Sequence, residues 1–326
     1  MFMRRPRSLP SFTDEQYRVA HQLLATRIAS MSGRKLEEAD WSNVYCAAKG
    51  IPEVGWSNLN IDVIYNGIGI EHKMLKKRIG TRMRDICGTR QMHPSATRSI
   101  RIPLTTDDAD SVMREVLSQY RTFLEERSRR VSGQAGGISP DMRTGWLLWE
   151  EGLREFLYFE EETIAPDPAD YYAEWRSSGG GTRKSSRNIW VFERETGIKR
   201  YSITTLAGAK VQPYFDVPSA DDPNVYLFRV QSEQLDGGQV RLWITPATER
   251  ELRRLVGETN PESLSVVIAS VAAEVPDEQQ GAYSGREQAA TPLVLTAESY
   301  QLLTTTLGGV SDEDMIRRLV HRLRSR

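Results

Sequence analysis

The chain has 326 residues, of which 39% are hydrophobic and 27% charged, a balance typical of a globular protein with a sizeable core. Lys and Arg number 43 against 44 for Asp and Glu, so the net charge of -1 excludes a protein that coats nucleic acid through general basicity. Cys46 and Cys87 are too few for a disulfide framework, and no apolar run reaches the ~20 residues of a membrane span. With no signal-peptide pattern at its start, the chain is expected to be cytoplasmic.

Two helices followed by a hairpin are predicted in the first 75 residues. Helical spacing of apolar residues indicates a helix from about Ser11 to Met31 and another from Leu36 to Ala48. The period then changes to the alternation of strands over residues 60–65 and 68–74. Asn66-Gly67 lies between them and is the strongest short signal for a hairpin turn.

The remaining elements are predicted by the same periodicities. A helix is expected over Asp107–Arg130 and a helical, aromatic-rich stretch over Gly145–Phe159, and the Pro- and Gly-containing segment from Ala165 to about Gly181 is interpreted as a linker. Beyond it, strands are expected at residues 188–193, 200–205, 225–230 and 240–244, helices at 248–255, 296–307 and 312–324, and a buried strand at 264–272. The prediction is an α/β chain with one domain at residues 1–165 and a more strand-rich α/β region at 180–326.

Charge is distributed unevenly along the chain. The segment Lys73–Arg101 has nine basic residues and one acidic residue, whereas Glu150–Asp170 has eight acidic residues and one basic residue. The overall neutrality is therefore a cancellation between separate surfaces, and local patches of either sign are expected.

The hairpin carries the residues with the clearest chemistry. Glu71 and Lys73 are two positions apart on one strand, so their side chains leave the same face, and the Asn-Gly turn brings Asp62 towards them. Two carboxylates beside one ammonium are costly to bury for structural reasons alone. The arrangement suits Mg²⁺ held between Asp62 and Glu71, with Lys73 orienting or deprotonating a water and stabilising charge on a phosphorane.

Asp62 followed by Glu71-x-Lys73 across a short hairpin resembles the PD-(D/E)XK nuclease superfamily, most familiarly the type II restriction endonucleases. The resemblance covers mainly residues 36–75. It implies a mixed sheet flanked by helices, Mg²⁺ as cofactor, and an acidic residue on the preceding helix, Glu38 or else Glu37, as a further metal ligand. It also implies double-stranded DNA as substrate, a homodimer for cutting a symmetric site, and a companion DNA methyltransferase. The Pro that leads the family motif is replaced by Ile61, and His72 between Glu71 and Lys73 should point away from the metal.

The basic run downstream of the hairpin fits a phosphate backbone better than a small acidic molecule. A second basic stretch, Gly179 to Arg187, lacks the pattern of a phosphate-binding loop and is interpreted as a linker or as a further DNA contact. The residues expected to contact DNA are Lys76, Lys77, Arg78, Arg82, Arg84, Arg90, Arg183 and Lys184.

Three alternatives stay open from the sequence. The chain could be a nuclease that reads DNA structure rather than sequence, or a non-catalytic DNA-binding protein whose edge hairpin carries an incidental Glu-x-Lys. The third alternative is a protein-binding module built around the acidic surface of residues 150–170.

Overall fold

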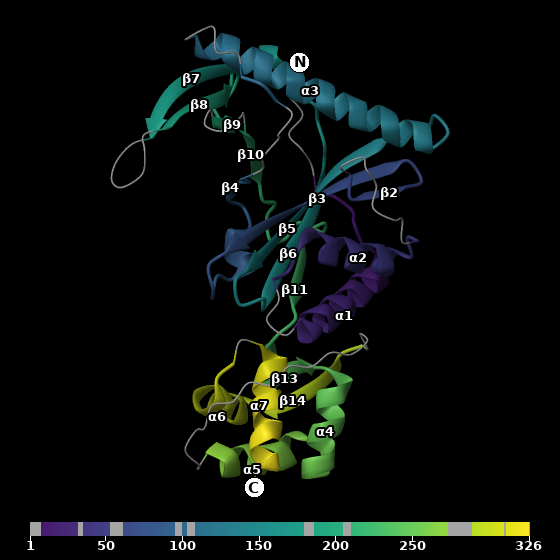
Figure 1. Cartoon of the computed structure of the whole chain (residues 1–326), viewed down its shortest axis with the longest axis vertical. Helices are drawn as coiled ribbons and strands as arrows, with labels where there is room; N and C mark the ends of the chain where they lie inside the picture. Colours follow the sequence, from purple (N-terminus) through teal and green to yellow (C-terminus); the bar gives the residue numbers. More distant parts are fainter. Residues whose placement is uncertain are drawn as a thin grey trace.

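The computed structural model describes residues 8–31, 35–52, 61–94, 100–102, 108–178, 186–204, 210–272, 289–309 and 311–325. Within these residues the chain is a mixed α/β protein, as predicted, with three sheets arranged along one long axis (Figure 1). The sheet that carries the hairpin lies in the middle. The second sheet and the long helix α3 lie at one end, and the carboxy-terminal unit lies at the other (Figure 1).

The first sheet holds the predicted hairpin. Its strand order is β1-β6-β5-β3-β2, and β11 pairs with β6 as well. All pairings are antiparallel except that of β3 with β5, which α3 connects as a crossover. The strands are β1 (Ser8–Leu9), β2 (Val63–Tyr65), β3 (Ile68–Lys77), β5 (Asp141–Glu150), β6 (Glu155–Glu162) and β11 (Tyr226–Arg229).

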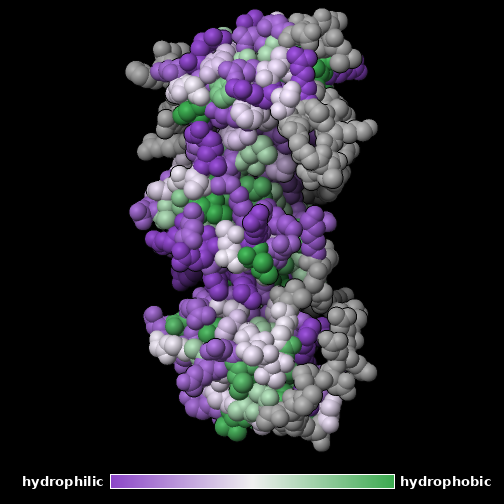
Figure 2. Space-filling view, turned by 90° about the vertical axis from the view of Figure 1, so that its left-hand side faces the viewer, coloured by the Kyte–Doolittle hydropathy of each residue, from purple (hydrophilic) through white to green (hydrophobic). Residues whose placement is uncertain are grey.

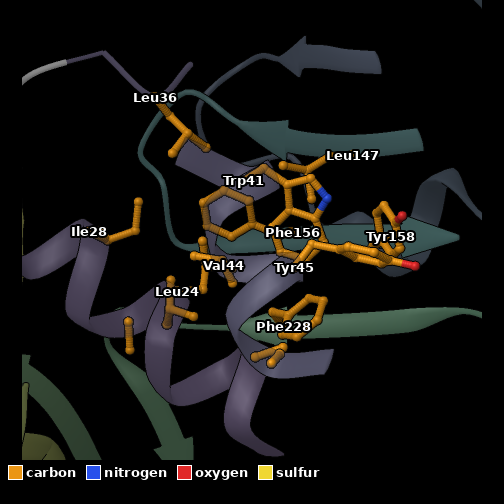
Figure 3. Packing of buried hydrophobic residues seen from close by; sticks show 14 of the residues in the cluster. Leu24, Ile28, Leu36, Trp41, Val44, Tyr45, Leu147, Phe156, Tyr158 and Phe228 are labelled. Carbon is orange, nitrogen blue, oxygen red and sulfur yellow. The ribbon is translucent and has the colours of Figure 1, made fainter. Parts of the chain in front are cut away.

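Helices α1 (Asp14–Ser30) and α2 (Glu38–Lys49) pack on one face of this sheet. Both are capped by their own sequence: Thr13 and Gln16 form a capping box on α1, and Gly50 ends α2 in a left-handed conformation. Figure 3 shows the resulting core, in which side chains of the two helices meet those of β5, β6 and β11. Burying each of the large side chains there contributes about 2–3 kcal/mol to stability.

The second sheet lies beside the first, at the end of the molecule where α3 lies (Figure 1). It is antiparallel, in the order β4-β10-β9-β8-β7, and α3 (Ala109–Gln134) covers one of its faces. Its strands are β4 (Arg90–Met92), β7 (Tyr171–Ser178), β8 (Ser186–Glu193), β9 (Lys199–Thr204) and β10 (Lys210–Asp216), and two 3-10 turns, Met83–Ile86 and Pro168–Asp170, lie in the connections.

A small carboxy-terminal unit completes the fold. Four helices surround a three-stranded sheet in the order β12-β13-β14, around an apolar core of their own. The elements are β12 (Glu233–Leu235), β13 (Gln239–Ile244), α4 (Pro246–Val256), α5 (Pro261–Ala272), β14 (Thr291–Thr296), α6 (Ala297–Leu307) and α7 (Asp312–Arg324).

Three sequence-based predictions of local structure are wrong. Gly145–Phe159 forms parts of β5 and β6 rather than a helix. The strand was missed because residues 146–149 are buried on both faces of the sheet, so their sequence lacks the alternation of a half-exposed strand. Residues 264–272 belong to helix α5, which begins at Pro261 with Asn260 accepting from the backbone N–H of Ser263. The expected linker includes β7, which pairs with β8 along its whole length.

The sheets also cross the predicted division between residues 165 and 180. β11, from the second predicted domain, pairs with β6 from the first, and β10 pairs with β4. The two predicted regions therefore share sheets instead of forming separate ones.

Candidate active site

The hairpin turn is formed by the residues that predicted it. Asn66 and Gly67 adopt positive φ angles of 49° and 81°, as a tight hairpin turn requires. The ladder pairs Val63 with Ile70, which places Asp62, immediately before β2, opposite Glu71. The backbone N–H of Asp62 donates to the carbonyl of Ile70 at 3.1 Å. The Asp62 carboxylate in turn accepts from the backbone N–H of His72 at 2.6 Å, so it is held against β3.

Glu71 and Lys73 share the face of β3 that points away from α1 and α2. Lys73 Nζ lies 2.6 Å from Glu71 Oε1. His72 points to the opposite face, as expected, where it is fully buried among Trp41, Tyr45 and Tyr158. Its Nδ1 is 2.8 Å from the Ser42 hydroxyl, which ties the hairpin to α2.

Helix α3 contributes a residue that the sequence analysis did not single out. The guanidinium of Arg127 forms an ion pair with Glu71 Oε2, so both oxygens of this carboxylate face a cation. The Arg127 side chain is only 8% exposed and stacks on the Phe123 ring at 4.0 Å. A signal was present: Arg127 continues the apolar stripe of Leu124 and Val131, and a cation on a buried stripe needs a partner.

The pKa shifts of Asp62 and Lys73 indicate different roles for these two side chains. Burial raises the pKa of Asp62 to about 6, and the nearby Glu38 and Glu71 carboxylates act in the same direction. Burial alone would lower the pKa of Lys73, but the carboxylates of Glu71, Glu38 and Asp62 outweigh it and raise this pKa. Lys73 is therefore held as a charged ammonium, which can orient a ligand or stabilise an anion but cannot accept a proton as a base.

The donors suit a hard cation only in part. Asp62 and Glu71 offer carboxylate oxygens, the ligands Mg²⁺ prefers, and Mg²⁺ is commonly held by one or two carboxylates with waters and phosphate. Among the described residues, however, no group of three or more His, Cys, Asp or Glu side chains is placed to hold a metal ion. Glu38, at the first position of α2, lies close enough to Asp62 and Lys73 to influence both, without completing such a group.

Further polar groups line the same face of the sheet. The register places Glu71, Thr144 and Glu161 in one row across β3, β5 and β6. Glu161 accepts from the indole N–H of Trp146 at 2.7 Å, and burial raises its pKa to about 7. The Nε2–H of His93 donates to the backbone carbonyl of Met74 at 3.1 Å, and burial lowers the pKa of His93 to about 4.

Most of the residues expected to contact DNA have partners within the protein. Ion pairs join Lys76 to Glu151, Arg82 to Asp85, Arg84 to Asp221 and Arg90 to Asp216, and Lys77 donates to Gln91. Arg78 is exposed, and the described part of the chain offers it no ion pair. Arg183 and Lys184 lie outside the described residues. The basic run therefore presents less free charge than its sequence indicates.

Comparison with known proteins adds no relative: no family model, curated protein or solved structure matches the chain. In the described parts of the chain, none of the helices is long and apolar enough to cross a membrane.

Proposed function

We propose that the protein is a Mg²⁺-dependent endonuclease that cleaves double-stranded DNA at specific sites, in the manner of a type II restriction endonuclease with a restriction-endonuclease-like sheet. The observation that carries the proposal is the juxtaposition of Asp62, Glu71 and Lys73 by a tight hairpin, with Glu38 within electrostatic range. Under this proposal the enzyme acts as a homodimer, with a companion methyltransferase protecting the host DNA.

Each residue has a distinct role in this proposal. Asp62 and Glu71 would hold the cation, which supplies a Lewis acid and an activated water when bound. The Lys73 ammonium, charged and next to Glu71, is suited to hold a phosphate oxygen and to stabilise the charge that develops as the P–O bond breaks. Arg127 and Lys73 fix the orientation of the Glu71 carboxylate, whose remaining lone pairs would be the ones available to a cation.

The test is a digest of unmethylated phage DNA by the purified protein with Mg²⁺, Mn²⁺ or a chelator. Discrete fragments with the metal ions and none with the chelator support the proposal. A smear or cutting only at branched DNA would replace it with a structure-specific nuclease. Glu71→Gln should abolish cleavage, whereas Glu125→Gln, an exposed carboxylate on α3, should not.

A non-catalytic DNA-binding protein is the second candidate, and one observation favours it. Glu71 is already neutralised by Lys73 and Arg127, an arrangement that also suits a purely structural ion cluster. This candidate predicts DNA binding that a chelator leaves unchanged and no nicking with either metal ion.

A further inference from the structure

The second sheet has two very different faces. One is covered by α3 and holds an apolar core that includes Ile189, Val191, Ile203 and Val211. The other face carries large side chains as well, although no helix of the described chain covers it. Large apolar groups gathered on the solvent side of a sheet commonly mark a binding surface.

The outer face is an aromatic strip that crosses the sheet from strand to strand. The rings of Tyr172 and Phe192 stack at 5.2 Å with an angle of 19°, and Phe192 meets Trp190 edge-on at 6.4 Å. Trp190 is 36% exposed and Met92, at the far edge of the sheet opposite Tyr214, is 37% exposed. We call Tyr172, Trp190, Phe192 and Tyr214 the aromatic strip.

Two cations lie on this strip. Lys199 Nζ is 3.4 Å from the centre of the Trp190 ring and 4.9 Å from that of Tyr214, and the Arg176 guanidinium is 5.3 Å from Trp190. Arg176 pairs with Glu174, but Lys199 forms no ion pair with any described residue. Burial and the neighbouring Arg176 lower the pKa of Lys199 to about 8. The rings attract this cation, but no carboxylate of a described residue neutralises its charge, so Lys199 is available to contact an anionic ligand.

We propose that the aromatic strip with Lys199 and Arg176 binds single-stranded nucleic acid, stacking bases on the rings while the cations contact phosphates. Rings combined with basic side chains are the means by which proteins hold single strands without sequence preference. A duplex is a poorer fit, because its bases are stacked on each other and their faces are closed to the rings. With strands about 4.8 Å apart, the strip from β7 to β10 is about 14 Å wide, enough for a short run of nucleotides.

This inference goes beyond the proposed nuclease activity. The strip lies on β7–β10, whereas Asp62, Glu71 and Lys73 lie on the first sheet, and stacking requires no metal ion.

Figure 2 views the molecule from the side that is on the left in Figure 1. Hydrophilic side chains predominate over its upper and middle parts, with hydrophobic side chains scattered among them.

The test is fluorescence anisotropy of a labelled oligothymidylate of about 20 nucleotides, in chelator so that cleavage plays no part. Because stacking is worth about 1–3 kcal/mol per base, Trp190→Ala should weaken binding about 5- to 160-fold, and Trp190→Phe should recover much of the loss. Lys199→Ala should weaken binding and flatten its salt dependence. Arg253→Ala, an exposed arginine on α4, is the matched control and should bind as the wild type does.

Three results would overturn the inference: no binding by the wild type, tighter binding of a duplex of the same length, or equal affinities for wild type and Trp190→Ala. Circular dichroism of each variant separates loss of the strip from loss of the fold. A protein that binds the oligonucleotide but cuts no DNA with Mg²⁺ would refute the nuclease proposal and leave this inference standing.

Discussion

Arg127 on α3 and Glu71 on β3, which are 56 residues apart in the chain, form an ion pair on the face of the sheet that carries Lys73. The pair joins the long crossover helix to the hairpin. Since Lys73 occupies the other oxygen of the same carboxylate, Glu71 is the centre of a three-residue cluster whose geometry depends on both β3 and the crossover helix α3.

Replacing Arg127 should destabilise the protein. Arg127→Met keeps the aliphatic stem but leaves Glu71 with Lys73 alone, and losing a charged hydrogen bond of this kind costs about 2 kcal/mol. Urea denaturation measures the change. Arg121→Ala removes an exposed ion pair with Glu125 on the same helix and should cost about 0.5 kcal/mol or less. Equal losses for the two variants would show that the buried pair has no special role.

Gly145→Ala should disturb the sheet behind the site. A Cβ at this position would lie 2.5 Å from the hydroxyl of Tyr158 and 2.7 Å from Cδ2 of His72, both of which are fully buried. Overpacking of this kind costs about 1–3 kcal/mol. Thermal unfolding provides the measurement. Gly133→Ala on α3 meets nothing within 4 Å and should be neutral or stabilising by up to about 1 kcal/mol. A neutral Gly145→Ala would contradict the close approach.

Asp312 should make stability depend on pH. Burial raises its pKa to about 6, against hydrogen bonds from Ser232 and Trp243 and the charge of Arg154. Between pH ~4 and ~6 the folded protein keeps a proton that the unfolded chain has released, so stability falls as pH rises through this range and then levels off. The shift of about two units corresponds to roughly 2–3 kcal/mol.

The Asp312 effect is isolated by comparing unfolding curves at several pH values. Asp312→Asn should remove this part of the pH dependence, whatever its own stability. Glu298→Gln, an exposed carboxylate on α6, should keep the wild-type profile. An unchanged profile in Asp312→Asn would rule out the titration of Asp312 as its cause.

Arg78 should contribute more to duplex DNA binding than Arg82. Arg78 is exposed without an ion pair to the described residues, whereas Arg82 is bound by Asp85 at 2.9 Å. In chelator, Arg78→Ala should reduce the slope of log K against log salt by about 1. Arg82→Ala should change the slope less. A larger change in slope for Arg82→Ala than for Arg78→Ala would show that unpaired charge in this region does not determine DNA binding.

The sequence predicted the elements whose signals are local. Asn66-Gly67 predicted the hairpin, and the apolar stripe through Val116 and Leu124 predicted α3, because turn chemistry and helical periodicity are properties of neighbouring residues. The predictions failed where burial is set by tertiary contacts. Trp146 to Trp149 are covered on both sides, and this erased the alternation of β5.

The candidate site was predictable to the same extent. Asp62, Glu71 and Lys73 come together because one turn controls all three positions. The pairing of Arg127 with Glu71 depends on how α3 packs on the sheet. The pairing of Arg82 with nearby Asp85 depends on side-chain rotamers, and that of Arg90 with Asp216 depends on a distant strand. Such contacts have no local signature beyond a charged residue on an apolar stripe.

The most direct measurement of the central claim is the single-turnover rate of DNA cleavage with Mg²⁺ for Lys73→Met. If the ammonium stabilises charge on the scissile phosphate, the variant should bind duplex DNA as the wild type does but cut it at least ~100-fold more slowly. Lys35→Met, an exposed lysine outside the cluster, should cut at the wild-type rate. Wild-type cleavage by Lys73→Met would contradict the account.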